Sequence, residues 1–432
     1  MQEKKKRHFK LIHGDIGIWI VFFFLCVISL VEVFSASSTL SFRSHNYMGP
    51  IGYHALMIAL GIVACIVATA IPCKYYKLLT PWLLLVSFVT LIGVYVWGQN
   101  INGANRIINI FGITFQPSEI AKGSMILATA QILAATQRED GKGTDTSAMP
   151  FILWILFPML ALIGLENLST AALLFVVIFA MMFIGRVPLQ QLGKLMGFVI
   201  IATASVFFIA NKLFDEPDKE KEKQATTAVA RTNPADKSAE EEKAEEDEGL
   251  IKGVFHRFLT WKNRVISHYE SEKAKPEDYD FAGNFQVAHA HFAICKAGVL
   301  GSGPGNSVER DVLPQAFSDF IYAIIIEETG LIGAVFTALL YVILLFRCRS
   351  IAKRCENNFP AFLIMGLTIM LVTQAAMNMM VAVGLMPVTG QPLPLISKGG
   401  TSTIISCAYI GAILSVSRWA KQRELANSES QL

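Results

Sequence analysis

A carboxylate stands at the mouth of a long apolar run in Leu313-Pro314-Gln315-Ala316-Phe317-Ser318-Asp319-Phe320-Ile321-Tyr322-Ala323. A second stretch places a carboxylate and an ammonium at the start of another apolar run, in Phe115-Gln116-Pro117-Ser118-Glu119-Ile120-Ala121-Lys122. Ionisable groups in lipid are costly, so they usually face a bundle interior or a water-filled cavity and serve a function. The two stretches therefore predict a polar site embedded in a membrane protein.

The composition indicates the same class of protein. The chain has 432 residues, of which 53% are hydrophobic and 16% charged, and its mean hydropathy is +0.47. These values are typical of a polytopic membrane protein and exclude a soluble domain. The net charge of +3 gives no reason to expect nucleic acid as a partner. Most of the seven cysteines fall in apolar runs or in predicted cytoplasmic segments, so neither a disulfide framework nor a zinc site is expected.

Ten apolar runs predict an all-α polytopic membrane protein with ten transmembrane helices. The helices are expected near 14–35, 52–71, 81–97, 117–136, 150–166, 168–185, 196–213, 317–346, 360–384 and 401–420. With the N-terminus inside, eighteen basic residues fall in inner segments and only three in short outer loops, Arg43, Arg106 and Lys398. The positive-inside rule therefore predicts that both termini are cytoplasmic.

This topology divides the chain into a cytoplasmic N-terminus (1–13), helices 1–7 (14–213), a large extracytoplasmic loop between helices 7 and 8 (214–316), helices 8–10 (317–420) and a cytoplasmic tail (421–432). Residues 215–248 carry 13 acidic and six basic residues and no aromatic residue. Such a segment cannot bury a core, so we expect a disordered spacer. Residues 254–261 then predict an amphipathic interfacial helix, and residues 280–299 predict a segment that lies on the membrane or dips into it.

Three polar clusters fall at the outer end of the predicted bundle. The first joins Gly103-Ala104-Asn105-Arg106 to 116–122, where Glu119 and Lys122 share one helical face. An ordinary interfacial ion pair is an equally good interpretation. The second joins 301–308 to Asp319, whose alternative role is to cap the following helix. Glu327 and Glu328 are expected about 12–14 Å deeper, as hydrogen-bonded packing anchors rather than catalytic groups.

The third cluster joins Gln374 and Asn378, one helical turn apart, to the proline- and glycine-rich stretch 384–402. Non-helical backbone at membrane depth is tolerated only where protein or water surrounds it. Because all three clusters lie at one end in this topology, we expect them to form a single extracytoplasmic cavity.

The order of these motifs resembles the SEDS family (shape, elongation, division and sporulation) over nearly the whole membrane part of the chain. The resemblance rests on Gly-Ala…Arg…Phe-Gln-Pro-Ser-Glu-x-x-Lys, on Gly-x-Gly-Asn-Ser-Val…Asp-Phe-Ile-x-Ala…Glu-Glu-x-Gly, and on Pro-Val-Thr-Gly-x-Pro-Leu-Pro…Ser-x-Gly-Gly-x-Ser. Gly305-Asn306-Ser307-Val308 resembles the branch of cell division rather than that of elongation. The chain departs from the family pattern at Ile107, at Lys398 and at Glu166-Asn167-Leu168-Ser169.

The resemblance implies a peptidoglycan glycosyltransferase that polymerises lipid II, with inversion at the anomeric carbon, on the outer face of the bacterial cytoplasmic (inner) membrane. By motif, Asp319 is the essential carboxylate, Lys122 its ionic partner and Glu119 a neighbour in the same cavity. The expected substrate-binding residues are Arg106, Gln116, Ser118, Asn306, Ser307, Thr389, Ser397 and Lys398. The implied partners are a class B penicillin-binding protein (a transpeptidase) and other proteins of the division septum.

Simple chemistry fits this assignment. A carboxylate near a sugar hydroxyl serves as general base, and cationic groups stabilise a departing pyrophosphate. No cofactor is certain; a divalent cation, Mg²⁺ or Mn²⁺, would also neutralise the pyrophosphate, although the sequence contains no metal-ligand cluster. The alternatives are a lipid II flippase, an elongation polymerase and a non-catalytic scaffold. A flippase should need polar residues through the full membrane depth, whereas the charges here crowd the outer half.

Overall fold

The computed structural model describes residues 13–36, 49–101, 104–110, 113–138, 143–214, 250–273, 285–313 and 317–429. Its helices are α1 (Ile16–Ala36), α3 (Gly49–Ala70), α4 (Cys73–Trp97), α5 (Pro117–Ala135), α6 (Ala148–Glu166), α7 (Leu168–Ile184), α8 (Leu189–Phe214), α11 (Leu250–Lys273), α12 (Phe285–Ala297), the short 3₁₀ helix η2 (Glu309–Asp311), α13 (Ile321–Lys353), α14 (Asn358–Ala382) and α15 (Thr401–Glu429). Its strands are β1 (Gln99–Ile101), β2 (Ala104–Ile110) and β3 (Ile113–Phe115).

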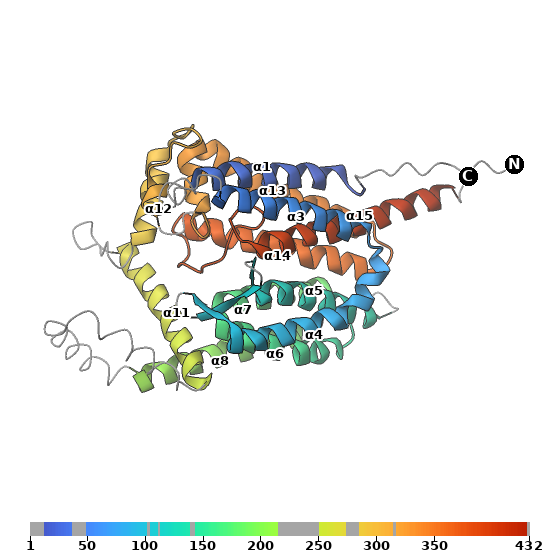
Figure 1. The fold of residues 1–432 in the computed structure, drawn as a ribbon. Coiled ribbons are helices and arrows are strands. Elements are labelled where there is room, and N and C mark those ends of the chain that lie inside the picture. Colours follow the sequence, from blue (N-terminus) through green and yellow to red (C-terminus); the bar gives the residue numbers. More distant parts are fainter. Residues whose placement is uncertain are drawn as a thin grey trace.

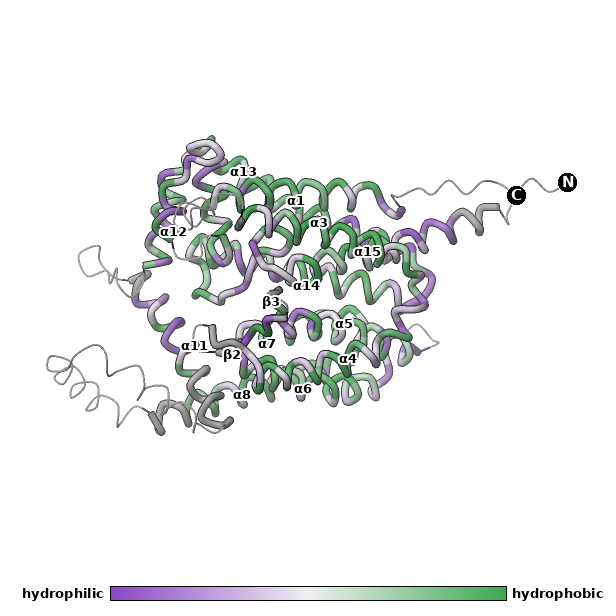
Figure 2. The backbone as a smooth tube through the Cα atoms, viewed as in Figure 1, coloured by the Kyte–Doolittle hydropathy of each residue, from purple (hydrophilic) through white to green (hydrophobic). Residues whose placement is uncertain are grey.

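Each of the ten apolar runs lies in a helix, namely α1, α3 to α8 and α13 to α15. Within the described residues, eight of them are long and apolar enough to cross a membrane; α7, with 17 residues, is shorter, and α5 is not among the eight. Figure 2 shows hydrophobic residues along the middle of the helices and hydrophilic residues toward the two ends of the bundle. The chain is thus a helical, multi-pass membrane protein.

Three helices are longer than predicted. Helix α4 begins at Cys73 rather than near 81, because Pro72 precedes the helix and Pro81 is accommodated inside it. Helix α8 begins at Leu189, and α15 continues to Glu429 beyond its apolar part. The hydrophobic runs marked the part of each helix that meets lipid, whereas the polar ends extend past it.

The helices run between two ends of the bundle (Figure 1). We call one the terminal end, because α1 begins there and α15 ends there. Two contacts join the segments at this end: Arg347 on α13 pairs with Asp15 at 3.2 Å, and Arg423 on α15 pairs with Glu356 at 2.5 Å. We call the other the sheet end; it holds β1 to β3, α11 and α12. The described start and end of the chain therefore lie on the same side.

A small antiparallel sheet in the order β1-β2-β3 corrects the all-α prediction. The pairs Gln99↔Ile107 and Ile108↔Phe115 set its register. Isoleucine is frequent in these strands, and β-branched residues favour an extended backbone. Strands this short carry little periodic signal, so the segment was expected to be a loop. The sheet places Arg106 on β2 and leads directly into α5.

Helix α13 is broken at Gly330, whose φ of 70° and ψ of −169° are not helical. The hydroxyl of Tyr322 donates to the carbonyl of Ala334 at 3.1 Å. A straight helix would separate these residues by about 18 Å, so the segment 321–329 folds back beside the longer segment. The structure therefore contradicts the expected depth of Glu327 and Glu328. Glu328 contacts Ser35 near the C-terminal end of α1, at the sheet end rather than deeper in the bundle.

The break at Gly330 yields a testable expectation. A side chain there would meet the carbonyl oxygen of Val299 at 2.3 Å, in a backbone conformation that L-residues rarely adopt. We expect Gly330→Ala to lower the free energy of unfolding by more than the roughly 1–3 kcal/mol of backbone strain alone. Thermal unfolding in detergent measures the effect. The control is Gly193→Ala on α8, where the new methyl group meets nothing within 4 Å; equal melting of both variants would contradict the argument.

Part of the large loop is helical. Helix α11 includes residues 254–261, which were predicted to form an interfacial helix, and it contacts α6, α7 and α8. Helix α12 packs against α13. The N-terminal segment 1–12, the predicted acidic spacer 215–248, Gly103 and Pro314 lie outside the described residues.

Candidate active site

The first cluster forms a buried ion pair on α5. The Lys122 ammonium donates to Glu119 Oε1 at 2.7 Å and to Gln374 Oε1 on α14 at 3.0 Å. Lys122 is 0% exposed and Glu119 3%. The predicted shared face of Glu119 and Lys122 is confirmed. Among the described residues, however, no ion pair joins Lys122 to Asp319, which corrects the expected partnership.

Asp319 lies in the turn immediately before α13. Its Oδ1 accepts a hydrogen bond from the Ser318 hydroxyl at 3.0 Å. The N-cap residue of α13 is Phe320, so Asp319 does not hold the capping position that its alternative role requires. Burial raises the pKa of the Asp319 carboxyl, while the Ser318 bond and the charges of Arg106 and Arg264 act in the opposite direction. The side chain is half-buried and points near Gly390, where an added Cβ would lie 3.8 Å from Oδ2.

Backbone contacts hold this turn against the third cluster. The Ser397 hydroxyl donates to the carbonyl of Ser318 at 2.7 Å, and the Lys398 amide donates to the carbonyl of Phe317 at 3.0 Å. The stretch itself is folded tightly. Leu395 has a φ of 69°, unusual for a non-glycine residue, and is buried. A loop held in one conformation by several contacts fixes the position of the Asp319 turn.

Two amides on α14 connect Lys122 with the Asp319 turn. Gln374 accepts from Lys122 and donates to the carbonyl of Pro392 at 3.0 Å. One turn further, Asn378 donates to the carbonyl of Asp319 at 2.9 Å and to that of Gln391 at 2.8 Å. Their spacing on one helical face placed Gln374 and Asn378 in the third predicted cluster, but no catalytic or substrate-binding role was predicted for them. They bring parts of all three clusters together, as expected.

Three cations lie around this region. Arg106 donates through Nε to the carbonyl of Glu166 at 3.0 Å, and Arg264 on α11 donates to the carbonyl of Val388 at 3.1 Å. The Lys398 ammonium lies 5.0 Å from the centre of the Phe317 ring, and burial lowers its pKa. Arg264 was not predicted as a site residue, because its position on an amphipathic helix far from the motifs gave no signal.

Polar groups of further residues lie in the same region. Ser118 is buried, and its hydroxyl accepts from the Gln116 amide at 3.2 Å. Within the described part of the chain, the buried Oγ1 of Thr389 and Oδ1 of Asn378 have no hydrogen-bond partner. Buried polar atoms are normally satisfied, so these two atoms are unfilled hydrogen-bond acceptors among the described residues near the Asp319 turn.

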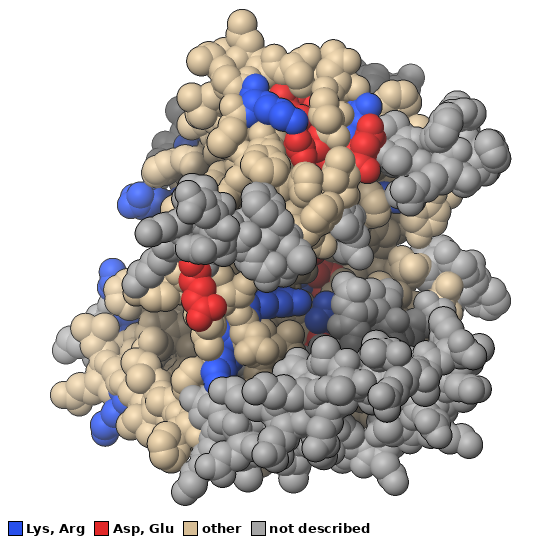
Figure 3. All heavy atoms as spheres, turned by 90° about the vertical axis from the view of Figure 1, so that its left-hand side faces the viewer, with Lys and Arg blue, Asp and Glu red and all other residues tan. Residues whose placement is uncertain are grey.

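Figure 3 shows the sheet end as a surface, with a hollow between the upper and lower parts of the molecule. Acidic and basic side chains are visible inside this hollow. A carboxylate with a raised pKa next to several cations suits proton abstraction from a neutral hydroxyl and stabilisation of an anionic leaving group.

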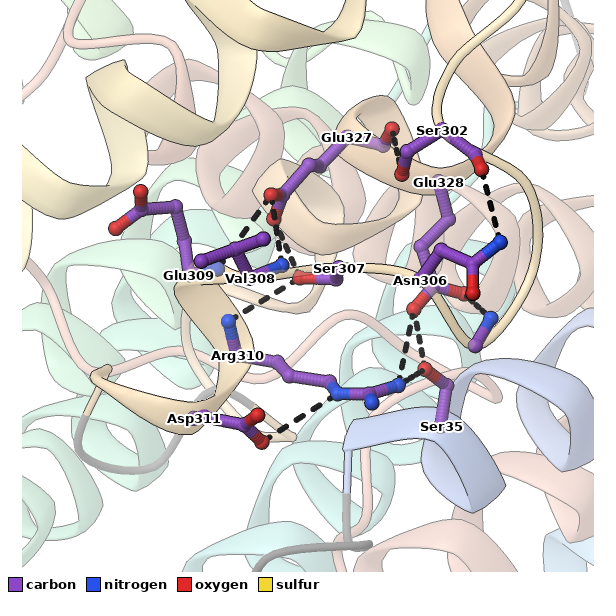
Figure 4. A network of polar contacts seen from close by, with 11 residues as sticks. Ser35, Ser302, Asn306, Ser307, Val308, Glu309, Arg310, Asp311, Glu327 and Glu328 are labelled. Carbon is purple, nitrogen blue, oxygen red and sulfur yellow. Dashed lines mark hydrogen bonds and ion pairs between the residues drawn. The ribbon is translucent and has the colours of Figure 1, made fainter.

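Asn306 and Ser307 belong to a different network (Figure 4). The Ser307 hydroxyl donates to Glu327, and the Val308 amide donates to Glu327 Oε1 at 2.9 Å. Glu328 accepts from the Gly305 amide at 2.9 Å. Asn306 is exposed and donates to the carbonyl of Ser302. Among the described residues no hydrogen bond joins Asn306 or Ser307 to the Asp319 turn. The contacts of Asn306 and Ser307 indicate that these residues hold the loop in place. Glu327 and Glu328 accept hydrogen bonds from the loop and thus act as the packing anchors that were predicted.

The chain is similar to known proteins over most of its length. The family model FTSW_RODA_SPOVE, described as a cell cycle protein, matches residues 16–228 and 250–422. The chain is 28% identical over 416 residues to the probable peptidoglycan glycosyltransferase FtsW of Coxiella burnetii, covering 92% of this chain and 95% of that protein. It is 27% identical over 413 residues to the protein of the same name from Pseudomonas fluorescens, covering 94% and 88%.

Solved structures share the fold. A chain described under "Structural coordination of polymerization and crosslinking by a peptidoglycan synthase complex" matches with a TM-score of 0.65 and 22% identity, over 95% of this chain and 99% of that one. The rod shape determining protein RodA of Thermus thermophilus matches with a TM-score of 0.58 and 21% identity, over 94% and 97%. At these identities the likeness concerns the fold.

Proposed function

The chain belongs to the FtsW/RodA/SpoVE family of cell cycle proteins, and from this premise we propose that it is a peptidoglycan glycosyltransferase of the FtsW kind. Its substrate is lipid II, and it acts in septal cell-wall synthesis during division. The curated relatives carry the name peptidoglycan glycosyltransferase FtsW, which supports this activity and favours division over elongation. The observation that carries the proposal is Asp319, held by backbone contacts in a polar, cation-rich region at the sheet end.

In this mechanism Asp319 removes the proton from a sugar hydroxyl of the acceptor. The hydroxyl oxygen forms a bond to the anomeric carbon of the donor, and the bond from that carbon to the pyrophosphate oxygen breaks. Direct displacement inverts the anomeric centre. Burial raises the pKa of Asp319, which makes it a stronger base than an exposed carboxylate. The proton on Asp319 is then lost to solvent.

Arg106, Arg264 and Lys398 are the cations proposed to stabilise the departing pyrophosphate. Lys122 is committed to Glu119 and Gln374, so its role is to hold the α5–α14 contact behind the site. Thr389 and Asn378 are buried, so they are proposed to shape the polar surroundings of the Asp319 turn rather than to contact the sugar. Ser397 holds the turn that carries Asp319 through its hydrogen bond to the carbonyl of Ser318, and it is not proposed to contact the substrate.

The part of the chain that the structure describes offers no site for a protein-held metal. The described residues contain no group of three or more His, Cys, Asp or Glu side chains that could hold a metal ion. No step above depends on one. A divalent cation remains part of the proposal only as a counter-ion that would arrive bound to the pyrophosphate of lipid II.

The decisive experiment uses the purified full-length chain in liposomes with labelled lipid II. We expect glycan polymer. Movement of lipid II between leaflets without polymer would support the flippase, and neither product, with and without an added class B penicillin-binding protein, would support the scaffold. That transpeptidase is the proposed partner, because a structural neighbour is a chain of a peptidoglycan synthase complex. Depletion in cells separates the two polymerase roles: filaments indicate division, and rounded cells indicate elongation.

The proposed topology has ten crossings in the inner membrane, with both termini in the cytoplasm and Asp319 on the outer face. The shared terminal end of α1 and α15 and its basic residues support this orientation. We expect membrane-impermeant labelling of cysteines introduced at positions 225 and 425 to place them on opposite sides. Labelling of both from the same side would contradict the orientation.

A further inference from the structure

A cavity of about 250 Å³ lies at the terminal end, between the start of α1 and the late parts of α13 and α15. It is remote from the proposed active site, because Arg347 on its wall is about 25 Å along α13 from the break at Gly330. A water molecule occupies roughly 30 Å³ of liquid, so the cavity has room for a larger polar group. The proposed mechanism makes no use of it.

Three cations and two carboxylates line the cavity. Arg347 pairs with Asp15 at 3.2 Å, and Asp15 also accepts the Ile18 amide at 3.2 Å. Arg354 pairs with Glu424 at 3.7 Å, a long contact. Among the described residues Lys421 has no ion-pair partner. The carboxylates thus orient the two arginines and leave one positive charge uncompensated.

Apolar faces of two helices lead to this cavity. On α1, Ile16 lines it and is 66% exposed, and Ile20 and Phe23 continue the same face at helical spacing with 51% and 61% exposure. On α13, Phe346 and Ile343 stand before Arg347, with 60% and 44% exposure. Both helices are long and apolar enough to span a membrane. A charged pocket therefore adjoins two lipid-facing surfaces.

We propose that this cavity binds the headgroup of an anionic phospholipid, with its acyl chains along α1 and α13. The phosphate lies at Lys421 and Arg354, where it competes with the long Glu424 contact. Basic pockets between membrane helices suit anionic headgroups, and an arginine binds a phosphate through two parallel hydrogen bonds. A free anion would use the charges alone, whereas a phospholipid uses the charges and the adjoining apolar faces.

The test measures binding of phosphatidylglycerol to the delipidated full-length protein by native mass spectrometry. The variant Arg354→Gln/Lys421→Gln removes two cations from the cavity. Its matched control is Arg349→Gln/Lys353→Gln, which removes two exposed charges from the same stretch of α13 outside the cavity wall. We expect the cavity variant to bind phosphatidylglycerol at least about tenfold more weakly than the wild type. The control variant should bind it like the wild type.

Two further probes decide the chemistry of the ligand. Phosphatidylcholine, which has no net charge, should bind at least about tenfold more weakly than phosphatidylglycerol. Millimolar inorganic phosphate should fail to displace the lipid. Equal loss in both double variants, no loss in either, or equal binding of phosphatidylcholine would overturn the proposal. Displacement by phosphate would assign the cavity to a soluble anion instead, which also overturns it.

Folding is checked separately. The cavity variant should melt like the wild type without added lipid and should retain polymerisation activity in neutral lipid. If it does not fold, the single charge reversal Lys421→Glu at an exposed position gives the same comparison, with the same expected loss of phosphatidylglycerol binding. Wild-type binding by a folded Lys421→Glu protein would overturn the proposal.

Discussion

Replacement of Asp319 by Asn should lower the rate of lipid II polymerisation by about 10²–10⁴-fold. Asn keeps the shape of the side chain, and its Oδ1 still accepts from the Ser318 hydroxyl. The contact from Asn378 goes to the backbone of residue 319 and is unaffected. The substitution therefore removes the proton acceptor and little else. The measurement is polymer formed per unit time by purified, correctly folded protein.

The dependence of the rate on pH adds a second readout. The base must be ionised, and burial raises the pKa of Asp319 above its ordinary value. Activity of the wild type should therefore fall as the pH decreases through that raised pKa, and the residual activity of Asp319→Asn should lack this acid limb. Asp311→Asn, an exposed carboxylate on η2, is the matched control and should behave like the wild type. Near-normal polymer from Asp319→Asn would refute the catalytic role.

Replacement of Lys122 by Met should destabilise the protein by about 3–5 kcal/mol, because it leaves a buried carboxylate without its partner. Glu119 is 3% exposed, and its side chain bonds to the Lys122 ammonium at 2.7 Å. Met has nearly the same length as Lys, so packing changes little. The double variant Glu119→Gln/Lys122→Met should recover most of the lost stability, because no charge is then buried alone.

Thermal or denaturant unfolding in detergent measures these differences. The single variant should also lose activity, since Lys122 holds Gln374, one turn from the amide that fixes Asp319. Wild-type melting of Lys122→Met would show that the ion pair contributes nothing to the fold. Failure of the double variant to regain stability would show that Lys122 stabilises the bundle through contacts other than its charge.

Much of the fold followed from local patterns. A helix that crosses lipid must be apolar over about 20 residues, so the apolar runs located the helices without knowledge of their neighbours. The pairing of Glu119 with Lys122 also followed locally, because residues three apart share a helical face. The same reasoning placed Gln374 and Asn378 on one face of the third cluster, although it gave them no catalytic or substrate-binding role.

Contacts between distant segments were decided by the tertiary structure. Local spacing cannot show that Lys122 meets Gln374, which lies 252 positions away. The family motif instead suggested Asp319 as the ionic partner of Lys122, and the structure shows Glu119 and Gln374 in that place. The three short strands were missed because their pairing, rather than any periodicity, defines them.

Local sequence patterns were sufficient to identify a helical membrane protein with ionisable groups gathered toward one end, because solvation by lipid constrains every residue of a span independently. Which of those groups form one site depends on contacts between segments that are far apart in the chain. A single glycine conformation at Gly330 reverses the chain, which brings Glu327 and Glu328 to the loop and leaves Asp319 beside α14. Backbone dihedrals at one residue redirect everything that follows, and their outcome depends on packing against segments far away in the chain.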